Sequence, residues 1–182
     1  MSFLDLSLPL SIKSTKVNPI GAFFNPVLRE AVTYDVAVGF FTSGWIRDAA
    51  EGIARFAAKG GKARWIVSPV LSPEDYAALS DTSGALKERA VDKVIKRSFE
   101  ELYEGLQQDT RAMIAWLIRD EVLQFRVGVP KNNLKGMLHA KIGVFTDELG
   151  NKIGFSGSYN LTAHAATNWE KIEIYCAWKS DE

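Results

Sequence analysis

The sequence is poor in the residues that build disulfides and transition-metal sites. Among its 182 residues it has one cysteine, Cys176, and two histidines, His139 and His164. A single cysteine excludes an internal disulfide framework and a cysteine-rich zinc site. Two histidines without further cysteines argue against a protein-built transition-metal site. We therefore expect no metal and no other cofactor.

An excess of charge of one sign and long apolar runs are also lacking. The 22 basic and 22 acidic side chains cancel, so only the local distribution of charge can point to nucleic acid. No apolar run approaches the roughly 20 residues of a membrane-spanning helix. The N-terminal residues also lack a basic region followed by a small-residue cleavage site. These absences predict a cytoplasmic protein with no membrane partner.

The remaining composition, 47% hydrophobic and 11% aromatic residues, is that of a globular domain. Apolar β-forming runs over 35–41 and 62–68 flank a helical period over 44–59, which predicts a βαβ unit with parallel strands. The pattern elsewhere predicts further helices over 27–33, 73–79, 86–106 and 109–119, and further strands over 122–129, 137–145, 152–156 and 170–178. We expect one α/β domain over residues 1–182, with a mixed sheet.

The predicted strand over 137–145 combines a polar face with an apolar one. Because side chains alternate along a strand, His139 and Lys141 share a face, and Gly143 beside them leaves room for a ligand. An imidazole next to an ammonium on a strand that is otherwise apolar opposes the usual preference for burial. We expect the opposite face to belong to the core, with Leu138, Ala140, Ile142 and Val144.

A second polar group follows the strand over 152–156, and a third opens the last strand. Ser158 and Asn160 can hydrogen-bond an anion, and Glu170 supplies a carboxylate. Together with His139 and Lys141 these residue types suit phosphoryl transfer. A neutral histidine can attack phosphorus, lysine and asparagine can hold the oxygens on which charge develops, and a carboxylate can fix the imidazole tautomer.

The order and spacing of these residues closely resemble the HKD signature of the phospholipase D superfamily. His139-x-Lys141 is followed after sixteen residues by Ser158-x-Asn160 and after nine more by Glu170, as in the small nuclease branch. The aspartate of the family's signature would fall at position 146, whereas here Asp147 follows one residue later.

The resemblance extends upstream and covers most of the chain. Segments 24–26, 35–45 and 62–69 resemble the phospholipase D-like domain at the N-terminus of some bacterial DEAD/DEAH-type helicases and restriction-associated proteins. This implies a mixed β-sheet flanked by helices on both faces. It also implies that the chain can be the N-terminal fragment of a longer protein, with a C-terminal helicase region or a helicase partner.

The resemblance further implies a role for each site residue. The chain has one HKD motif where the superfamily site needs two, which predicts a homodimer with the site on its twofold axis. His139 of one subunit would be the nucleophile, and the same histidine of the second subunit the general acid. Lys141 and Asn160 would cradle the phosphate, Ser158 would support it, and Glu170 would orient a histidine.

Substrate class is predicted from the charges that precede the motif. Arg126, Lys131 and Lys135 lie in a stretch with no acidic residue between Leu123 and Ala140, which suits contacts to a DNA backbone. Three aromatic residues near the motif can stack on bases or belong to the core: Trp45, Tyr159 and Trp169.

Three functions remain open from the sequence. The first is a metal-independent DNA nuclease domain that works through a phosphohistidine in a restriction or defence protein. The second is a catalytically silent module that binds DNA or mediates dimerisation for a helicase. The third is a phospholipase-type phosphodiesterase that acts on lipids or small molecules.

Overall fold

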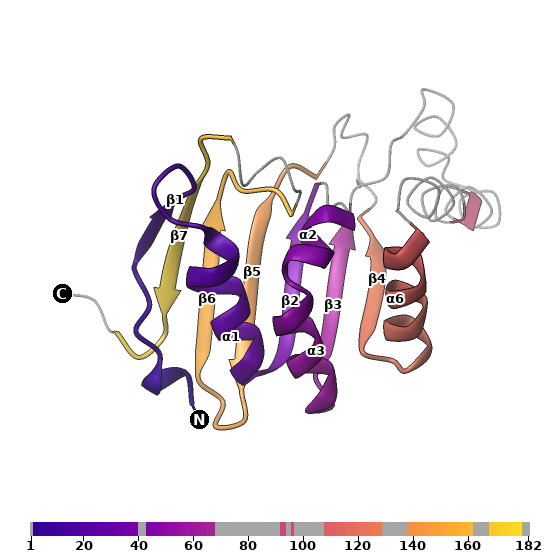
Figure 1. The fold of residues 1–182 in the computed structure, drawn as a ribbon, viewed down its shortest axis with the longest axis horizontal. Helices are drawn as coiled ribbons and strands as arrows, with labels where there is room; N and C mark the ends of the chain where they lie inside the picture. The colour runs from indigo at the N-terminus through magenta and orange to yellow at the C-terminus, as the bar shows by residue number, and fades with distance from the viewer. Residues whose placement is uncertain are drawn as a thin grey trace, which may run out of the picture.

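The described part of the chain is built around a seven-stranded mixed β-sheet (Figure 1). The structure is a computed structural model, and it describes residues 2–39, 43–67, 92–93, 96, 108–128, 138–161 and 168–179. The strands lie in the order β1-β7-β6-β5-β2-β3-β4. Their bounds are β1 Ser11–Lys13, β2 Ala31–Val38, β3 Lys62–Val67, β4 Leu123–Val127, β5 Lys141–Asp147, β6 Lys152–Gly157 and β7 Lys171–Cys176.

The strand directions confirm the expected α/β class. β2, β3 and β4 run parallel to one another, and every other pair of neighbours in the sheet is antiparallel. The predicted βαβ unit is present as β2, two helices and β3. The sheet is therefore mixed, with a parallel half and an antiparallel half that meet between β2 and β5.

The helices agree with the prediction in part. The helix predicted over 44–59 is divided into α2, Ser43–Asp48, and α3, Ala50–Ala58. The helix predicted over 109–119 is α6, Gln108–Arg119. The helices predicted over 73–79 and 86–106 lie outside the described residues, except for 92–93 and 96, which are helical. None of the described helices is long and apolar enough to cross a membrane.

The N-terminal region differs from the prediction. In place of the single helix predicted over 27–33, the chain forms a short 3-10 helix Phe3–Asp5, strand β1, a π-helix Ile20–Phe24 and helix α1, Asn25–Glu30. The helix predicted over 27–33 is present over 27–30 but ends at Glu30, because Ala31 already begins β2. The β-branched and aromatic residues that follow it favour the extended chain, and two neighbouring strands pair with them.

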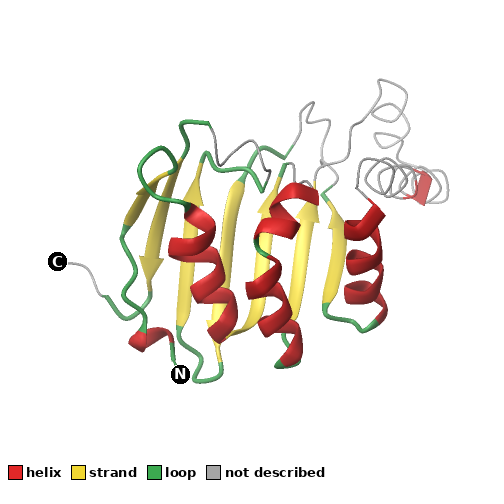
Figure 2. Cartoon of the chain, in the orientation of Figure 1, coloured by secondary structure: helices red, strands yellow, loops and turns green. Residues whose placement is uncertain are grey.

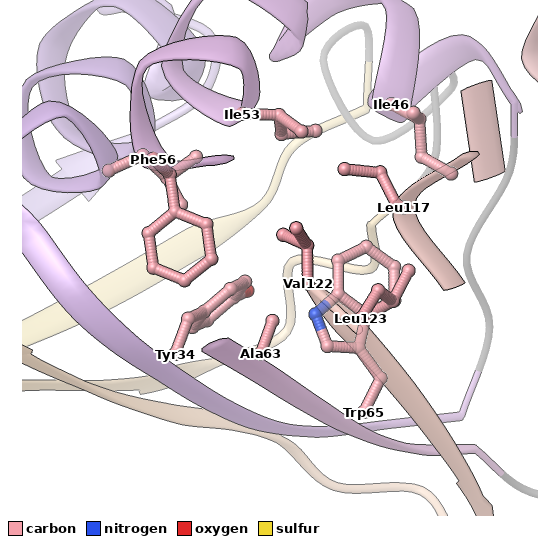
Figure 3. A pocket seen from close by; sticks show the side chains of 10 residues that line it. Tyr34, Ile46, Ile53, Phe56, Ala63, Trp65, Leu117, Val122 and Leu123 are labelled. Carbon is pink, nitrogen blue, oxygen red and sulfur yellow. The ribbon is translucent and has the colours of Figure 1, made fainter. Parts of the chain in front are cut away.

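The described helices cover one face of the sheet. Figure 2 shows α1, α2 and α3 in front of the strands. Ile46, Phe56 and Leu117, from α2, α3 and α6, line one apolar pocket against that face (Figure 3). Aromatic rings fill this layer; Tyr34 stacks on Phe145 with ring centroids 4.1 Å apart. Because apolar side chains line the pocket in Figure 3, it belongs to the packing of the core.

The predicted core face of β5 is the wrong one. Ile142 is 50% exposed and Val144 43% exposed, and Leu138 and Ala140, which precede the strand, are half-buried. The buried face contains Lys141, Gly143 and Phe145 instead. The reason is tertiary: Phe145 packs among the rings beneath the helices, and the ring of Phe155 occupies the space next to Gly143.

Candidate active site

The strand ends nearest to the predicted catalytic residues lie at one edge of the sheet, at the top in Figure 1. Lys141 begins β5 and pairs in register with Val38, the last residue of β2. Gly157 ends β6 and pairs with Ile172 at the start of β7. This edge lies at the carboxyl ends of the parallel strands, where open α/β sheets commonly bind ligands. The antiparallel turns thus bring segments that lie far apart in the sequence to one place.

His139 and Lys141 form the centre of the site. The strand begins later than predicted, so His139 lies just before β5 and is exposed. The Lys141 Nζ lies 2.9 Å from the His139 Nε2 and donates a hydrogen bond to the His139 carbonyl oxygen, also at 2.9 Å. A protonated Lys141 makes Nε2 the acceptor, so a neutral His139 then has its proton on Nδ1.

Lys141 is a cation with little access to water. It is 6% exposed, and burial lowers its pKa, while the negative charge of Glu170 acts in the opposite direction. Glu170 precedes β7 and Lys141 begins β5, so this charge interaction acts across the intervening strand β6. The site therefore contains a buried ammonium, an exposed imidazole and a half-buried carboxylate.

Ser158 is hydrogen-bonded to Lys171, the first residue of β7. Its hydroxyl accepts a hydrogen bond from the Lys171 N–H at 3.1 Å, and its own N–H donates to the Lys171 carbonyl oxygen at 3.1 Å. The preceding Gly157 has a φ of 156°, and a Cβ there would collide with the Lys171 carbonyl oxygen. Glycine is therefore required for this close approach. The hydroxyl proton of Ser158 is still able to donate to an anion.

Tyr159 and Asn160 follow Ser158 with different environments. Tyr159 is buried and stacks on Phe24 with a centroid distance of 5.8 Å. Burial raises the pKa of Tyr159, and the charges of Asp48 and Glu170 raise it further. Asn160 is half-buried, and its Oδ1 atom is buried with no hydrogen-bond partner among the described residues. An unpaired amide oxygen of this kind needs a donor, which water or a ligand would supply.

Glu170 is held by a residue that the sequence analysis missed. Ser14, just after β1, accepts a hydrogen bond from the Glu170 N–H at 2.8 Å through its hydroxyl, and its N–H donates to the Glu170 carbonyl oxygen at 3.0 Å. The Ser14 hydroxyl also donates to the Asn168 carbonyl oxygen. No sequence signal indicates this contact, because 156 positions separate Ser14 from Glu170.

Gly39 is a second missed residue. It follows β2, and a Cβ there would lie 2.8 Å from the Leu138 carbonyl oxygen and 3.9 Å from the His139 Cα. The absence of a side chain thus lets the backbone before His139 lie directly against the end of β2. A glycine after an apolar run is a weak signal in the sequence, because most glycines in that context only end a strand.

Arg126 is the one predicted substrate-binding residue that the structure describes, and it lies away from His139 and Lys141. Arg126 is exposed on β4 in the row that contains Ile66, Ala37 and Ile142, on the face without described helices. Three strand spacings, about 14 Å, separate β4 from β5. Lys131 and Lys135 lie outside the described residues.

Of the three aromatic residues proposed to stack on bases, two are buried. Trp45 and Tyr159 lie in the core, whereas Trp169 is 68% exposed. The core interpretation therefore holds for Trp45 and Tyr159.

Asp147, which lies one residue later than the HKD pattern requires, makes hydrogen bonds that hold the fold together. It is 3% exposed at the end of β5, and its carboxylate accepts hydrogen bonds from Ser2 Oγ, the Phe3, Leu149 and Asn151 N–H groups, and the Asn151 side-chain amide, at 2.8–3.0 Å. It thus ties the N-terminus to the β5–β6 turn, at the opposite end of β5 from Lys141. Within the described residues, no group of three His, Cys, Asp or Glu side chains could hold a metal ion.

Comparison with known proteins finds similarity in solved structures. No family model matches the sequence, and no curated protein is similar to it. Phosphatidylserine synthase from Haemophilus influenzae is similar with a TM-score of 0.55 and 14% identity, over 94% of this chain and 36% of that chain.

Two further solved structures are more distant. A phospholipase D family member, Nuc from Salmonella typhimurium, has a TM-score of 0.43 and 13% identity, over 86% of this chain and 77% of that chain. Yeast tyrosyl-DNA phosphodiesterase has a TM-score of 0.43 and 8% identity, over 81% of this chain and 25% of that chain. The chain thus spans about a third of the synthase and a quarter of the yeast enzyme. At this level of identity, the likeness to the synthase establishes a shared α/β fold.

Proposed function

We propose that this chain is a metal-independent phosphodiesterase that cleaves DNA through a covalent phosphohistidine, at a site shared by two copies of the chain. The observation that carries the proposal is the contact of the buried Lys141 ammonium with the His139 ring at 2.9 Å, within the electrostatic reach of Glu170. A buried cation needs an anion, and a phosphate diester beside a neutral imidazole supplies one.

In the first step the phosphodiester takes over the Lys141 ammonium and releases the His139 ring nitrogen. That nitrogen attacks phosphorus, a P–N bond forms, and the P–O bond to the leaving strand breaks. His139 of the partner subunit donates a proton to the leaving oxygen. Lys141 and Asn160 stabilise the charge that develops on the non-bridging oxygens.

In the second step water attacks the phosphohistidine. His139 of the partner subunit accepts a proton from this water, the P–N bond breaks, and a phosphate monoester leaves. Glu170 orients an imidazole and stabilises its cation, and Ser158 can donate its hydroxyl proton to the phosphate. The symmetry of a twofold site explains how one motif per chain supplies both histidines.

DNA as the substrate is supported by the positive charge of 126–135 and by the absence of acidic residues from 124 to 139. Contacts to phosphates from such a segment are electrostatic and independent of base sequence. Association with a helicase region in a restriction or defence protein is part of the same proposal, since it would bring this domain to DNA.

Cleavage of plasmid and oligonucleotide DNA in excess EDTA tests the proposal. We expect wild-type protein to cleave and His139→Ala to lose all measurable cleavage, because the nucleophile is gone. His164→Ala, which alters the one other histidine of the chain, is the matched control and should cleave like the wild type.

The alternatives predict different results in this assay. A DNA-binding protein that forms dimers but does not cleave DNA would be the silent module. Cleavage that EDTA abolishes, or that survives in His139→Ala, would overturn the mechanism. Hydrolysis of a phospholipid in preference to DNA would favour the lipid phosphodiesterase.

A further inference from the structure

The backbone that carries Glu170 is held from two sides by serine residues of different strands. On one side Ser158, after β6, exchanges two hydrogen bonds with Lys171, both at 3.1 Å. On the other side Ser14, after β1, makes three hydrogen bonds to residues 168 and 170. The segment that precedes β7 is therefore fixed between β1 and β6, the two strands that flank β7 in the sheet.

Ser14 takes part in this contact with both its hydroxyl and its backbone N–H. Its hydroxyl accepts from the Glu170 N–H at 2.8 Å and donates to the Asn168 carbonyl oxygen, and its own N–H donates to the Glu170 carbonyl oxygen at 3.0 Å. One side chain thus bridges the residues on either side of Trp169 and fixes the backbone direction from which the Glu170 side chain leaves. No alanine can replace this bridge, because the hydroxyl acts as donor and acceptor at once.

The negative charge of Glu170 raises the pKa of the buried Lys141 ammonium. The Coulomb interaction between a carboxylate and an ammonium weakens with distance. If the backbone of Glu170 were less firmly held, its carboxylate would therefore raise the pKa of Lys141 by less. We propose that Ser14 is a positioning residue, which holds Glu170 so that its carboxylate faces the Lys141–His139 pair. This inference rests on the proposed function for its catalytic consequence, but the contact itself can be tested without DNA cleavage.

The kinetic test compares Ser14→Ala, Ser14→Thr and Ser11→Ala in the EDTA cleavage assay. We expect Ser14→Ala to lower kcat about tenfold with KM nearly unchanged, because a small misplacement of a catalytic group costs rate rather than binding. Ser14→Thr keeps a hydroxyl and should restore most of the rate. Ser11→Ala, on the same strand but hydrogen-bonded to Glu173, is the matched control and should match the wild type.

A double variant separates positioning from general weakening of the fold. If Ser14 acts through the Glu170 carboxylate, Ser14→Ala should change kcat by less than about twofold once Glu170→Gln is present. A purely structural role would instead multiply the two losses. Thermal unfolding of all variants checks that β1 remains in the sheet.

The second readout is the titration of Lys141, followed by NMR on protein with ¹³C-labelled lysine and assigned with Lys141→Met. Glu170 raises the pKa of Lys141 against burial, so Glu170→Gln should lower it. Ser14→Ala should lower the pKa of Lys141 in the same direction by a smaller amount, and Ser11→Ala should leave it at the wild-type value.

The two readouts distinguish the failure of this inference from the failure of the proposed function. Wild-type protein that does not cleave DNA would overturn the function, while the Lys141 titration would still decide the role of Ser14. If Ser14→Ala leaves both kcat and the pKa of Lys141 at wild-type values, the positioning role is overturned even in an active nuclease. A loss of rate in Ser14→Ala that is fully additive with Glu170→Gln would also overturn it.

Discussion

At the scale of single residues, Lys141 is one of two buried charged residues in the described part of the sheet, with Asp147. Removing an ammonium from water is unfavourable unless other groups compensate for it. Here the compensation comes from the ring and carbonyl of His139 and from the charge of Glu170. A fold selected only for stability would place an apolar residue at the start of β5, so the lysine indicates a function.

Gly39 provides a prediction at the same scale. Gly39→Ala should reduce DNA cleavage on the order of tenfold, because its Cβ would lie 2.8 Å from the Leu138 carbonyl oxygen and displace the backbone before His139. Steady-state cleavage in EDTA measures the loss, and circular dichroism confirms that the fold is retained.

Gly21→Ala is the control for this substitution. A Cβ at Gly21 meets no atom within 4 Å, so this variant should cleave at the wild-type rate. Equal activity of Gly39→Ala and Gly21→Ala would show that the close approach has no bearing on the site.

At the scale of elements, β5 is anchored at both ends by side chains rather than by sheet pairing alone. Lys141 makes contacts at the site edge, and Asp147 receives its hydrogen bonds from the N-terminus and from the β5–β6 turn. Burial by itself would raise the pKa of Asp147, but these hydrogen bonds outweigh it and lower the pKa to about 2. The Asp147 carboxylate therefore stabilises the folded chain only while it is ionised.

The stability of Asp147→Asn should depend on pH in a defined direction. Since the pKa falls from 3.8 to about 2 on folding, the carboxylate contributes about 2 kcal/mol of unfolding free energy above pH 4. That contribution is lost as the pH falls from about 4 towards 2. Urea unfolding should show the variant less stable than the wild type at pH 7, with the difference shrinking across this interval.

Glu148→Gln serves as the reference, because Glu148 is the exposed neighbour in the same turn. It should unfold like the wild type at both ends of the interval. A deficit in Asp147→Asn that stays constant from pH 7 to pH 2 would attribute the effect to shape rather than to the charge of the carboxylate.

At the scale of the whole molecule, the question is how many histidines meet at the edge that carries His139. His139 is exposed, and one chain supplies one imidazole at this edge of the sheet, among the residues that the structure describes. In the proposed mechanism a second copy, related by a twofold axis through the site, supplies the protonating histidine.

Mixing subunits tests this requirement. When equal amounts of wild-type protein and His139→Ala exchange subunits at constant total concentration, only dimers with two wild-type subunits should cleave. Activity should then fall to about one quarter of the all-wild-type value. Light scattering measures the dimer, and two different affinity tags verify the exchange; an activity of one half would mean that each chain works alone.

The opposite sheet face belongs to the same scale. It presents Ile66, Ile142, Val144 and Tyr175 partly exposed, and a paired Asp35 and Arg64 lie among them. Such a surface is more apolar than the solvated face of an ordinary antiparallel sheet. The alternation of β5 therefore could not tell its two faces apart, because both carry apolar side chains.

The sequence by itself determined the elements with strong periodicity, and it predicts which residues form the site. The strand over 62–67, the parallel βαβ unit and the last helix follow from local patterns, because each pattern spans several residues of one element. The chemistry of His139, Lys141, Ser158, Asn160 and Glu170 suits phosphoryl transfer, and the resemblance of their order and spacing to the HKD signature predicts such a site.

Only the tertiary structure decided which face of β5 is buried and what holds Glu170. The burial of Lys141 rather than Ile142 depends on the rings that pack around Phe145, and these come from elements distant in sequence. Strand β1, Ser14 and the Asp147 tether likewise depend on pairs of residues more than 140 positions apart. Local propensity contains no information about such pairs, because they form only when the sheet brings β1 beside β7.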